Sequence, residues 1–168
     1  MNQIIKNISG VFLAATLFIS CTKETGPLTD VRPAVAVTVS NAIAYRPEPT
    51  VSVSKSAVVS PGVVGPIQIV LSIPSSSKHS IKSITKVTAS TSPASVQSTG
   101  TTGFYTSAPI LGSGTTATFN TTLTEYVAKT GQAISASNTE LTRRFYFLVT
   151  LDDDTVIITE AVRVLVLD

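Results

Sequence analysis

The end of the sequence, residues 143–168, constrains the fold most, because it is typical of two β-strands joined by a turn. Residues 145–151 form a continuous run of aromatic, aliphatic and Thr side chains, as expected of a strand covered on both sides. Asp152-Asp153-Asp154 favours a turn. Residues 155–168 then return with valines on one face at Val162, Val164 and Val166. The pattern predicts an antiparallel hairpin at the end of the chain.

Earlier stretches show the same alternation of apolar and polar residues. Strands are predicted over residues 50–54, 67–73, 82–90 and 115–124, and residues 34–45 predict a first strand or a strand-like tether. In residues 67–73 one face collects Ile67, Ile69, Leu71 and Ile73. In residues 82–90 alternation puts Ile84 and Val87 on opposite, mixed faces, which indicates an edge strand or a bulge.

Two segments depart from the strand pattern. Residues 91–114 are rich in Ser, Thr and Gly, and we expect a loop there with one short strand. Thr122-Leu123-Thr124-Glu125 has the spacing of a helix capping box, and Gly131 suits a helix end. We therefore expect one helical turn over residues 125–130.

Composition favours a folded sheet protein over disorder. Charged residues are 13% of the chain, and Ser and Thr make up roughly a quarter of it. Thr is β-prone, and short strands with turn signals and no long helical period predict an all-β domain built as a sandwich. A net charge of +2 without a long basic run gives no support for nucleic-acid binding.

Residues 1–20 have the build of a secretory signal peptide. Lys6 supplies a positive charge, Ile8–Ile19 supplies an apolar run, and Ser20 is a small residue. The apolar run is shorter than the roughly 20 residues that a spanning helix needs. Cys21 follows directly and is the only cysteine, so no disulfide can form within the chain.

Phe18-Ile19-Ser20-Cys21 resembles the lipobox of bacterial lipoproteins, with Phe18 where that family favours leucine. The resemblance implies cleavage before Cys21, alkylation of its thiol with diacylglycerol and acylation of its new amine. Several acyl chains hold a protein stably on a membrane, whereas one chain is marginal. The membrane is therefore an expected partner through lipidated Cys21. The alternative is an ordinary signal peptide followed by a free thiol.

The strands, and above all the closing hairpin, resemble immunoglobulin-like and fibronectin-type-III-like domains. The resemblance implies a single immunoglobulin-like antiparallel β-sandwich over residues 50–168, without the Trp and cysteine pair of antibody domains. Residues 1–20 would be the signal peptide, and residues 21–49 the lipid anchor and tether, with a candidate extra strand at 34–45. Such domains occur in small lipoproteins of Gram-negative outer membranes, including accessory proteins of glycan uptake.

Asp152, Asp153 and Asp154 form the acidic cluster of the sequence. Ca²⁺ takes roughly six to eight oxygen ligands, so Glu160 or Asp168 would have to assist. Consecutive turn residues point in different directions and no EF-hand spacing is present, which favours a solvated turn over a metal site. His79, the only histidine, lies in a polar loop and has no recognisable catalytic or zinc-ligand set around it.

Three other features invite a functional interpretation. Phe104 and Tyr105 are candidates for ligand contact on an exposed loop, and equally for the core. Arg143-Arg144 opens an apolar strand and is better explained as a charged guard against aggregation than as an anion clamp. Asp154-Thr155-Val156 resembles an O-glycosylation tripeptide of bacterial envelope proteins, with Thr155 as the acceptor.

These features predict a lipid-anchored outer-membrane protein that acts as a non-catalytic binding or accessory module for a glycan or a protein partner. Loops on a rigid scaffold would make the contact. The alternative is a structural subunit of an envelope complex that joins others by strand addition. We expect no enzyme activity, cofactor or nucleic-acid partner, and the sequence does not distinguish the periplasmic from the outer face.

Overall fold

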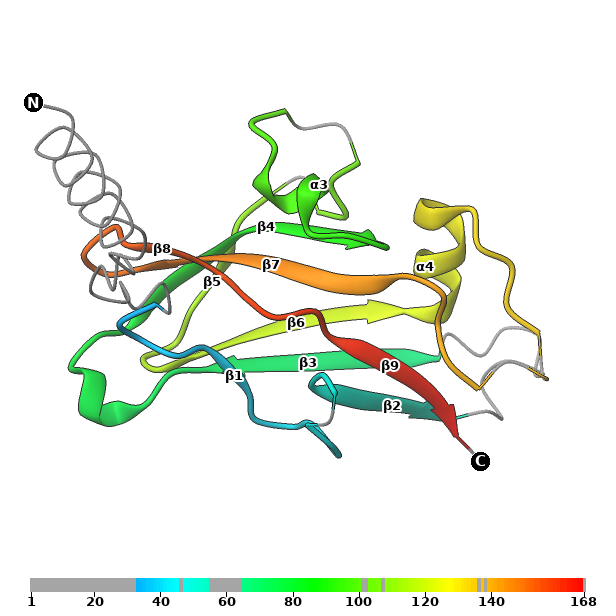
Figure 1. The fold of residues 1–168 in the computed structure, drawn as a ribbon, viewed down its shortest axis with the longest axis horizontal. Helices are drawn as coiled ribbons and strands as arrows, with labels where there is room; N and C mark the ends of the chain where they lie inside the picture. The colour runs from blue at the N-terminus through cyan, green and yellow to red at the C-terminus, as the bar shows by residue number, and fades with distance from the viewer. Residues whose placement is uncertain are drawn as a thin grey trace, which may run out of the picture. The chain divides into compact units, whose positions relative to one another are not determined.

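The computed structural model describes residues 33–45, 47–54, 65–100, 103–106, 108–135, 137 and 139–167. The chain divides into two units, Met1–Arg32 and Pro33–Asp168, and every described residue belongs to the second. The predicted signal peptide, Cys21 and the first part of the tether lie outside the described residues. The described part is mostly β-strand, with several antiparallel sheets packed on one another (Figure 1).

The first sheet is antiparallel and has the order β1 (Thr38–Val39), β3 (Pro66–Ser72), β6 (Thr116–Thr122). The alternation predicted for residues 67–73 is confirmed, since Ile67, Ile69 and Leu71 are buried and the residues between them face outward or are half-buried. Within residues 34–45, only β1 is a strand. The apolar face of β3 forms one wall of the core.

The second sheet is antiparallel and has the order β5 (Ile110–Leu111), β4 (Ile81–Ser90), β7 (Arg144–Leu151), β8 (Val156–Ile158). The prediction that residues 82–90 form an edge strand is wrong, because β4 lies between β5 and β7. The bulge is confirmed, since the register of β4 against β7 shifts between Ile84 and Lys86. This shift turns both Ile84 and Val87 into the core, where strict alternation would separate them.

A parallel pair joins the two ends of the described domain. β2 (Thr50–Ser54) runs beside β9 (Arg163–Leu167) in parallel. The prediction that residues 155–168 form one return strand is wrong, because the chain bends between β8 and β9. β8 pairs with β7, and beyond the bridge between Phe145 and Val162 the chain leaves β7 to join β2.

Thr159 satisfies the backbone at this bend. Its amide donates to the carbonyl of Phe147 over 3.0 Å, and its hydroxyl accepts from the Phe147 amide over 3.3 Å. The same hydroxyl donates to the carbonyl of Glu160 over 3.0 Å. A buried Thr therefore replaces the ladder hydrogen bonds that the bend removes.

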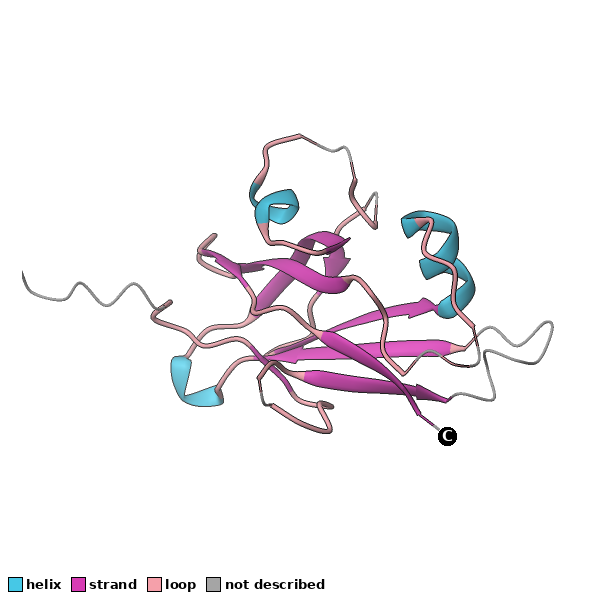
Figure 2. Cartoon of the chain, turned by 45° about the vertical axis from the view of Figure 1, so that its right-hand side comes forward, coloured by secondary structure: helices cyan, strands magenta, loops and turns pink. Residues whose placement is uncertain are grey.

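Two short α-helices connect the strands. The predicted helix is confirmed as α4 (Leu123–Thr130), in which the Thr122 hydroxyl accepts from the Glu125 amide and Gly131 ends the helix at a φ of 68°. The second, α3 (Ala94–Gln97), lies in the stretch expected to be a loop and packs on the outer side of β4 and β7 (Figure 2). A 3₁₀ turn, η2 (Ser75–Ser77), connects β3 to β4.

Six aromatic contacts at the centre of the core join residues of β6, β7, α4 and the loop before β5. Phe145 contacts four other rings, at centroid distances between 5.3 and 6.5 Å from Tyr105, Phe119, Tyr126 and Phe147. Phe145 and Phe147 are completely buried. Burying a side chain of this size contributes about 1.5–3 kcal/mol to stability. These rings therefore make the largest local contribution to holding the sheets together.

Candidate functional site

The acidic turn between β7 and β8 is the first part of the candidate site. The amide of Leu151 donates to the carbonyl of Thr155, and the Asp154 amide donates back to Leu151, which closes the turn. Asp154 has a φ of 65°, a conformation that Asp tolerates better than most residues. The carboxylate of Asp153 accepts from the Thr155 amide over 3.0 Å. The predicted hairpin turn is thus confirmed.

The chain before β4 brings His79 to this turn. Because Ile81 pairs with Leu151, the residues just before β4 face those just after β7. Nδ1 of His79 lies 3.0 Å from Oδ1 of Asp152 and 3.8 Å from Oδ2 of Asp153. Oδ2 of Asp152 accepts from both the amide and the hydroxyl of Ser80. The contacts of the Asp152 side chain with His79 and Ser80, called the latch below, therefore hold the β3–β4 connection against the acidic turn.

His79, Asp152 and Asp153 could together hold a metal ion, since one ligand atom from each lies within 4.8 Å of the others. A set of one imidazole and two carboxylates suits Zn²⁺ better than Ca²⁺. Asp154 takes no part because it pairs with Lys82 at 2.5 Å, and Asp168 lies outside the described residues. Both oxygens of Asp152 already accept hydrogen bonds, so the geometry favours the latch over a metal site.

The two carboxyl groups of this cluster are held ionised. The hydrogen bond from His79, followed by those from Ser80, lowers the pKa of Asp152 below its ordinary value. The pKa of Asp153 is lowered mainly by the hydrogen bonds from Thr155. Both side chains are nearly half exposed, so the turn presents negative charge to solvent at neutral pH.

We expect Asp152→Asn to lower the melting temperature slightly at neutral pH, and the difference from wild type to shrink as the pH falls below the ordinary pKa of Asp. The folded pKa of Asp152 lies below its unfolded value, so its contribution is complete above the unfolded pKa and is lost as pH falls through the folded one. Thermal melts from neutral pH down to about pH 3, below the ordinary pKa of Asp, would test this. Glu160→Gln removes an exposed carboxylate nearby and is the control. A gap between wild type and Asp152→Asn that does not shrink in acid would contradict the latch.

Of the two aromatic candidates, Tyr105 lies in the core and Phe104 is half-buried. Tyr105 is 3% exposed, and burial raises its pKa to about 12. Its hydroxyl shares a 2.7 Å hydrogen bond with Thr121, whose own hydroxyl donates to Glu125. The Phe104 ring lies under the ammonium of Lys86, 4.3 Å from its centroid. Tyr105 is therefore a core residue.

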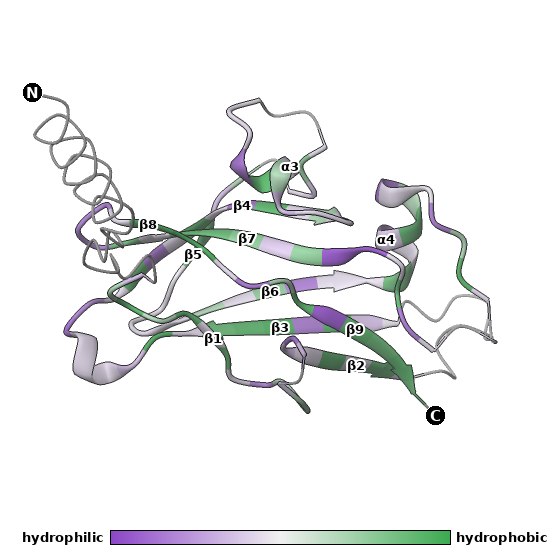
Figure 3. Cartoon of the chain, in the orientation of Figure 1, coloured by the Kyte–Doolittle hydropathy of each residue, from purple (hydrophilic) through white to green (hydrophobic). Residues whose placement is uncertain are grey.

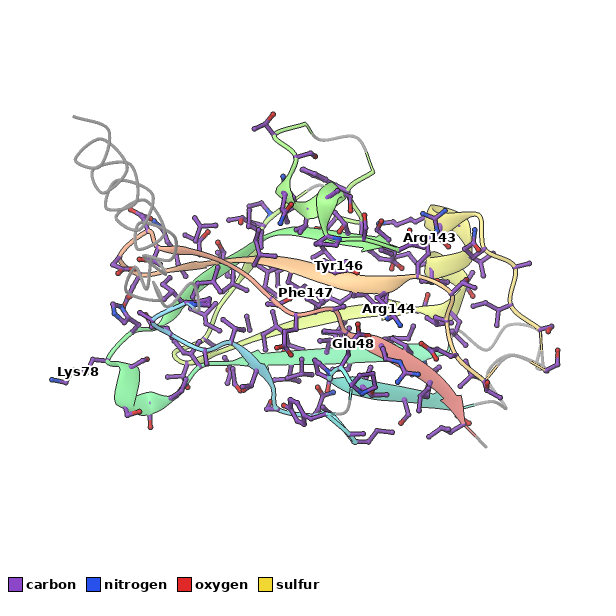
Figure 4. The ribbon with its side chains drawn as sticks, in the orientation of Figure 1. Glu48, Lys78, Arg143, Arg144, Tyr146 and Phe147 are labelled. Carbon is purple, nitrogen blue, oxygen red and sulfur yellow. The ribbon has the colours of Figure 1, made fainter. Side chains whose placement is uncertain are left out.

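Arg143 and Arg144 make contacts with different parts of the fold (Figure 4). Arg144 pairs with Glu48, with 2.6 Å between Nε and Oε2, and so ties the start of β7 to the chain before β2. The backbone of Arg143 is held by Tyr126, whose hydroxyl accepts from the Arg143 amide over 2.8 Å. The described contacts therefore tie Arg144 to Glu48 and the Arg143 backbone to Tyr126, and bring no anion clamp together from these two side chains.

The outer edge of β8 completes the candidate site, and sequence reasoning missed it. Among the described strands none lies beyond β8 in its sheet. Val156 is 56% exposed and Ile158 is 36% exposed, whereas Ile157 between them is buried. Figure 3 colours β8 as hydrophobic. Thr155, the candidate glycosylation site, is exposed beside them. The edge follows directly from the acidic turn, so apolar and acidic groups lie side by side.

Within the described residues, no helix is both long enough and apolar enough to cross a membrane. Comparisons of the whole chain with protein-family models, with curated proteins and with solved structures found no match.

Proposed function

We propose that this protein is a lipid-anchored outer-membrane lipoprotein whose domain is an immunoglobulin-like sandwich acting as a non-catalytic binding module. The anchor would be Cys21, lipidated after removal of residues 1–20. The residues between Cys21 and Pro33, where the domain begins, would connect the anchor to the domain, which would face the periplasm or the cell surface. The observation that carries the binding function is the open, apolar edge of β8 beside an acidic turn.

The strand order supports the immunoglobulin-like part of the proposal. The first part of the domain supplies strands to two sheets, since β1 pairs antiparallel with β3 and β2 pairs in parallel with the closing strand β9. The order β5-β4-β7-β8 and the pair β3-β6 then correspond to the two faces of such a sandwich.

The contacts of His79 support a non-catalytic role. A nucleophilic serine needs its hydroxyl hydrogen-bonded to a base. The Ser80 hydroxyl donates to Asp152 instead of to the imidazole, and the imidazole itself contacts Asp152. This arrangement orients a turn and leaves no activated hydroxyl among these three residues.

A protein partner fits the edge of β8 better than a glycan fits the two aromatic candidates. Tyr105 is buried among core rings and Lys86 covers one face of Phe104, while Tyr45, which is 50% exposed, precedes β2 in the chain. The open edge of β8 instead offers backbone groups and apolar side chains, which suit an extended peptide segment. The same edge favours the second candidate function, a subunit that assembles by strand addition.

We expect Cys21→Ser to abolish membrane anchoring, because it removes the thiol that would carry the diacylglycerol. When a Gram-negative host is fractionated, wild type should be found in the membrane fraction and Cys21→Ser in the soluble fraction. The intact mass of wild type should equal the chain from Cys21 plus lipid, without hexose increments unless Thr155 is glycosylated. Cys21→Ala should behave as Cys21→Ser does. A wild-type protein without lipid would refute the anchor.

A further inference from the structure

We infer that the outer edge of β8 binds an extended segment of a partner protein whose apolar residues are flanked by lysine or arginine. This inference deepens the binding function proposed above and rests on it, but it is independent of the lipid anchor. It follows from three features of β8: its free backbone groups, the exposed side chains beside them, and the charges at its two ends.

The backbone of β8 divides its hydrogen bonds between two sides. Backbone hydrogen bonds join Leu151 to Thr155 and Phe147 to Thr159 across the hairpin. Hydrogen-bonded and non-hydrogen-bonded pairs alternate along an antiparallel ladder, so the hydrogen-bonded pair between these two is Val149 and Ile157. The amide and carbonyl groups of Val156 and Ile158 therefore point away from β7. No described strand lies on that side, so these four groups are available to an added strand.

The side chains at this edge form an apolar row. Val156 and Ile158 project to the outer face of the sheet, and their cross-strand partners on β7 are Thr150 and Leu148. A strand added beside β8 would place its own alternate residues next to Val156 and Ile158 on that face. β-Branched or aliphatic residues at alternate positions would extend the row.

Acidic groups bracket β8. Asp152, Asp153 and Asp154 precede it and Glu160 follows it, all of them exposed. Lys82 pairs with Asp154 alone. Arg163, the nearest cation after β8, is held by Glu140 through two hydrogen bonds, to Oε1 and to Oε2. The edge thus keeps a surplus of negative charge, which complements basic residues on both sides of an incoming segment.

The same charges disfavour pairing between two copies of this chain. If two copies paired antiparallel along this edge so that the outward backbone groups of Val156 and Ile158 were all hydrogen-bonded, Ile157 of one copy would lie opposite Ile157 of the other. The acidic turn of one copy would then lie at the level of Glu160 of the other, at both ends of the pair. Like charges brought together in this way repel each other, so a partner with basic flanks is preferred over self-association.

The test uses the full chain, produced in a bacterial host and purified in detergent, with two end-capped peptides. One is Lys-Lys-Val-Thr-Val-Thr-Val-Lys-Lys, and the control has glutamate in place of each lysine. The lysine peptide should bind about tenfold or more tightly than the control at low salt, and the difference should shrink as salt screens the charges. In hydrogen-exchange measurements the lysine peptide should slow the exchange of the Val156 and Ile158 amides about tenfold or more, with little change at Ile157.

Three variants locate the site. Val156→Pro removes an outward amide without touching the β7 ladder, so it should weaken binding about tenfold or more while the melting temperature stays near wild type. Val156→Thr keeps the amide and the branched shape and should bind as wild type does. Glu160→Lys should weaken binding of the lysine peptide and improve binding of the glutamate peptide.

Four results would overturn the inference: no protection of these amides at millimolar lysine peptide, equal binding of both peptides, unchanged binding by Val156→Pro, or protection that grows with protein concentration alone. The last would make a second copy the occupant. A protein that carries no lipid but binds the lysine peptide would refute only the anchor. A lipidated protein that leaves the edge amides unprotected would refute the strand site, and with it the observation that carries the binding function, while the anchor would stand.

Discussion

Replacing Phe145 with Ala is expected to destabilise the domain by about 3–5 kcal/mol, the range for removing a large aromatic side chain from a packed core. Phe145 is completely buried and contacts four other rings from β6, β7, α4 and the loop that carries Tyr105. Its loss would leave a cavity at the point where these elements meet. The neighbouring rings are held by their own strands and cannot collapse fully into the space.

Thermal or urea unfolding of the purified protein would measure this effect. At roughly 2–4 °C per kcal/mol, the value for domains of about 150 residues, the melting temperature should fall by about 6–20 °C. Phe145→Leu keeps most of the volume and should cost clearly less. Leu111→Ala removes an equally apolar side chain that is 80% exposed and should change stability little. A Phe145→Ala protein as stable as Leu111→Ala would show that the rings do not form the core described above.

Gly112→Ala is expected to destabilise the domain by about 3 kcal/mol, at the upper end of the usual range for overpacking. A Cβ added at Gly112 would lie 1.9 Å from the carbonyl oxygen of Ile81 and 2.7 Å from its carbonyl carbon. Both are backbone atoms of β4, which β7 holds from the other side. The chain after β5 would have to move away, and the hydrogen bond from the Gly112 amide to the carbonyl of Lys82 would be lost.

Gly100→Ala is the matched control, because a Cβ there would meet nothing within 4 Å and its backbone is not in the left-handed region. It should leave the free energy of unfolding nearly unchanged. Hydrogen exchange of the Gly112→Ala protein should also show faster exchange of the β5 amides, while the β3–β6 pair stays protected. Equal stability of the two variants would mean that the close approach of residues 81 and 112 is not maintained.

The sequence predicted the elements whose signals are local. The alternation at residues 67–73, the valines of β9 and the turn at Asp152–Asp154 each reflect a periodicity or a turn preference that neighbouring residues specify. The capping pattern of Thr122 and Glu125 identified α4 for the same reason. An all-β domain with antiparallel sheets follows from these signals together.

Features that depend on which strands meet were beyond the sequence. The hairpin pattern predicted that β8 pairs with β7, but nothing within residues 155–168 indicates that β9 then pairs with β2, because the bend at Thr159 is determined by hydrogen bonds to Phe147 on another strand. The bulge that turns both Ile84 and Val87 inward likewise depends on the register with β7. Tyr105 is buried only because Phe119 and Phe145 surround it.

The sequence by itself therefore determined a mostly β fold with antiparallel sheets and most strand positions, because each depends on residues close together in the chain. The lipid anchor at Cys21 stays a prediction. Only the tertiary structure decided how the candidate site is assembled. His79 and Asp152 are 73 residues apart and meet because β4 and β7 pair antiparallel in one register. The edge of β8 is open because no described strand lies beyond it, and the chain that follows leaves β7 after Val162 and pairs with β2 instead of returning along β8.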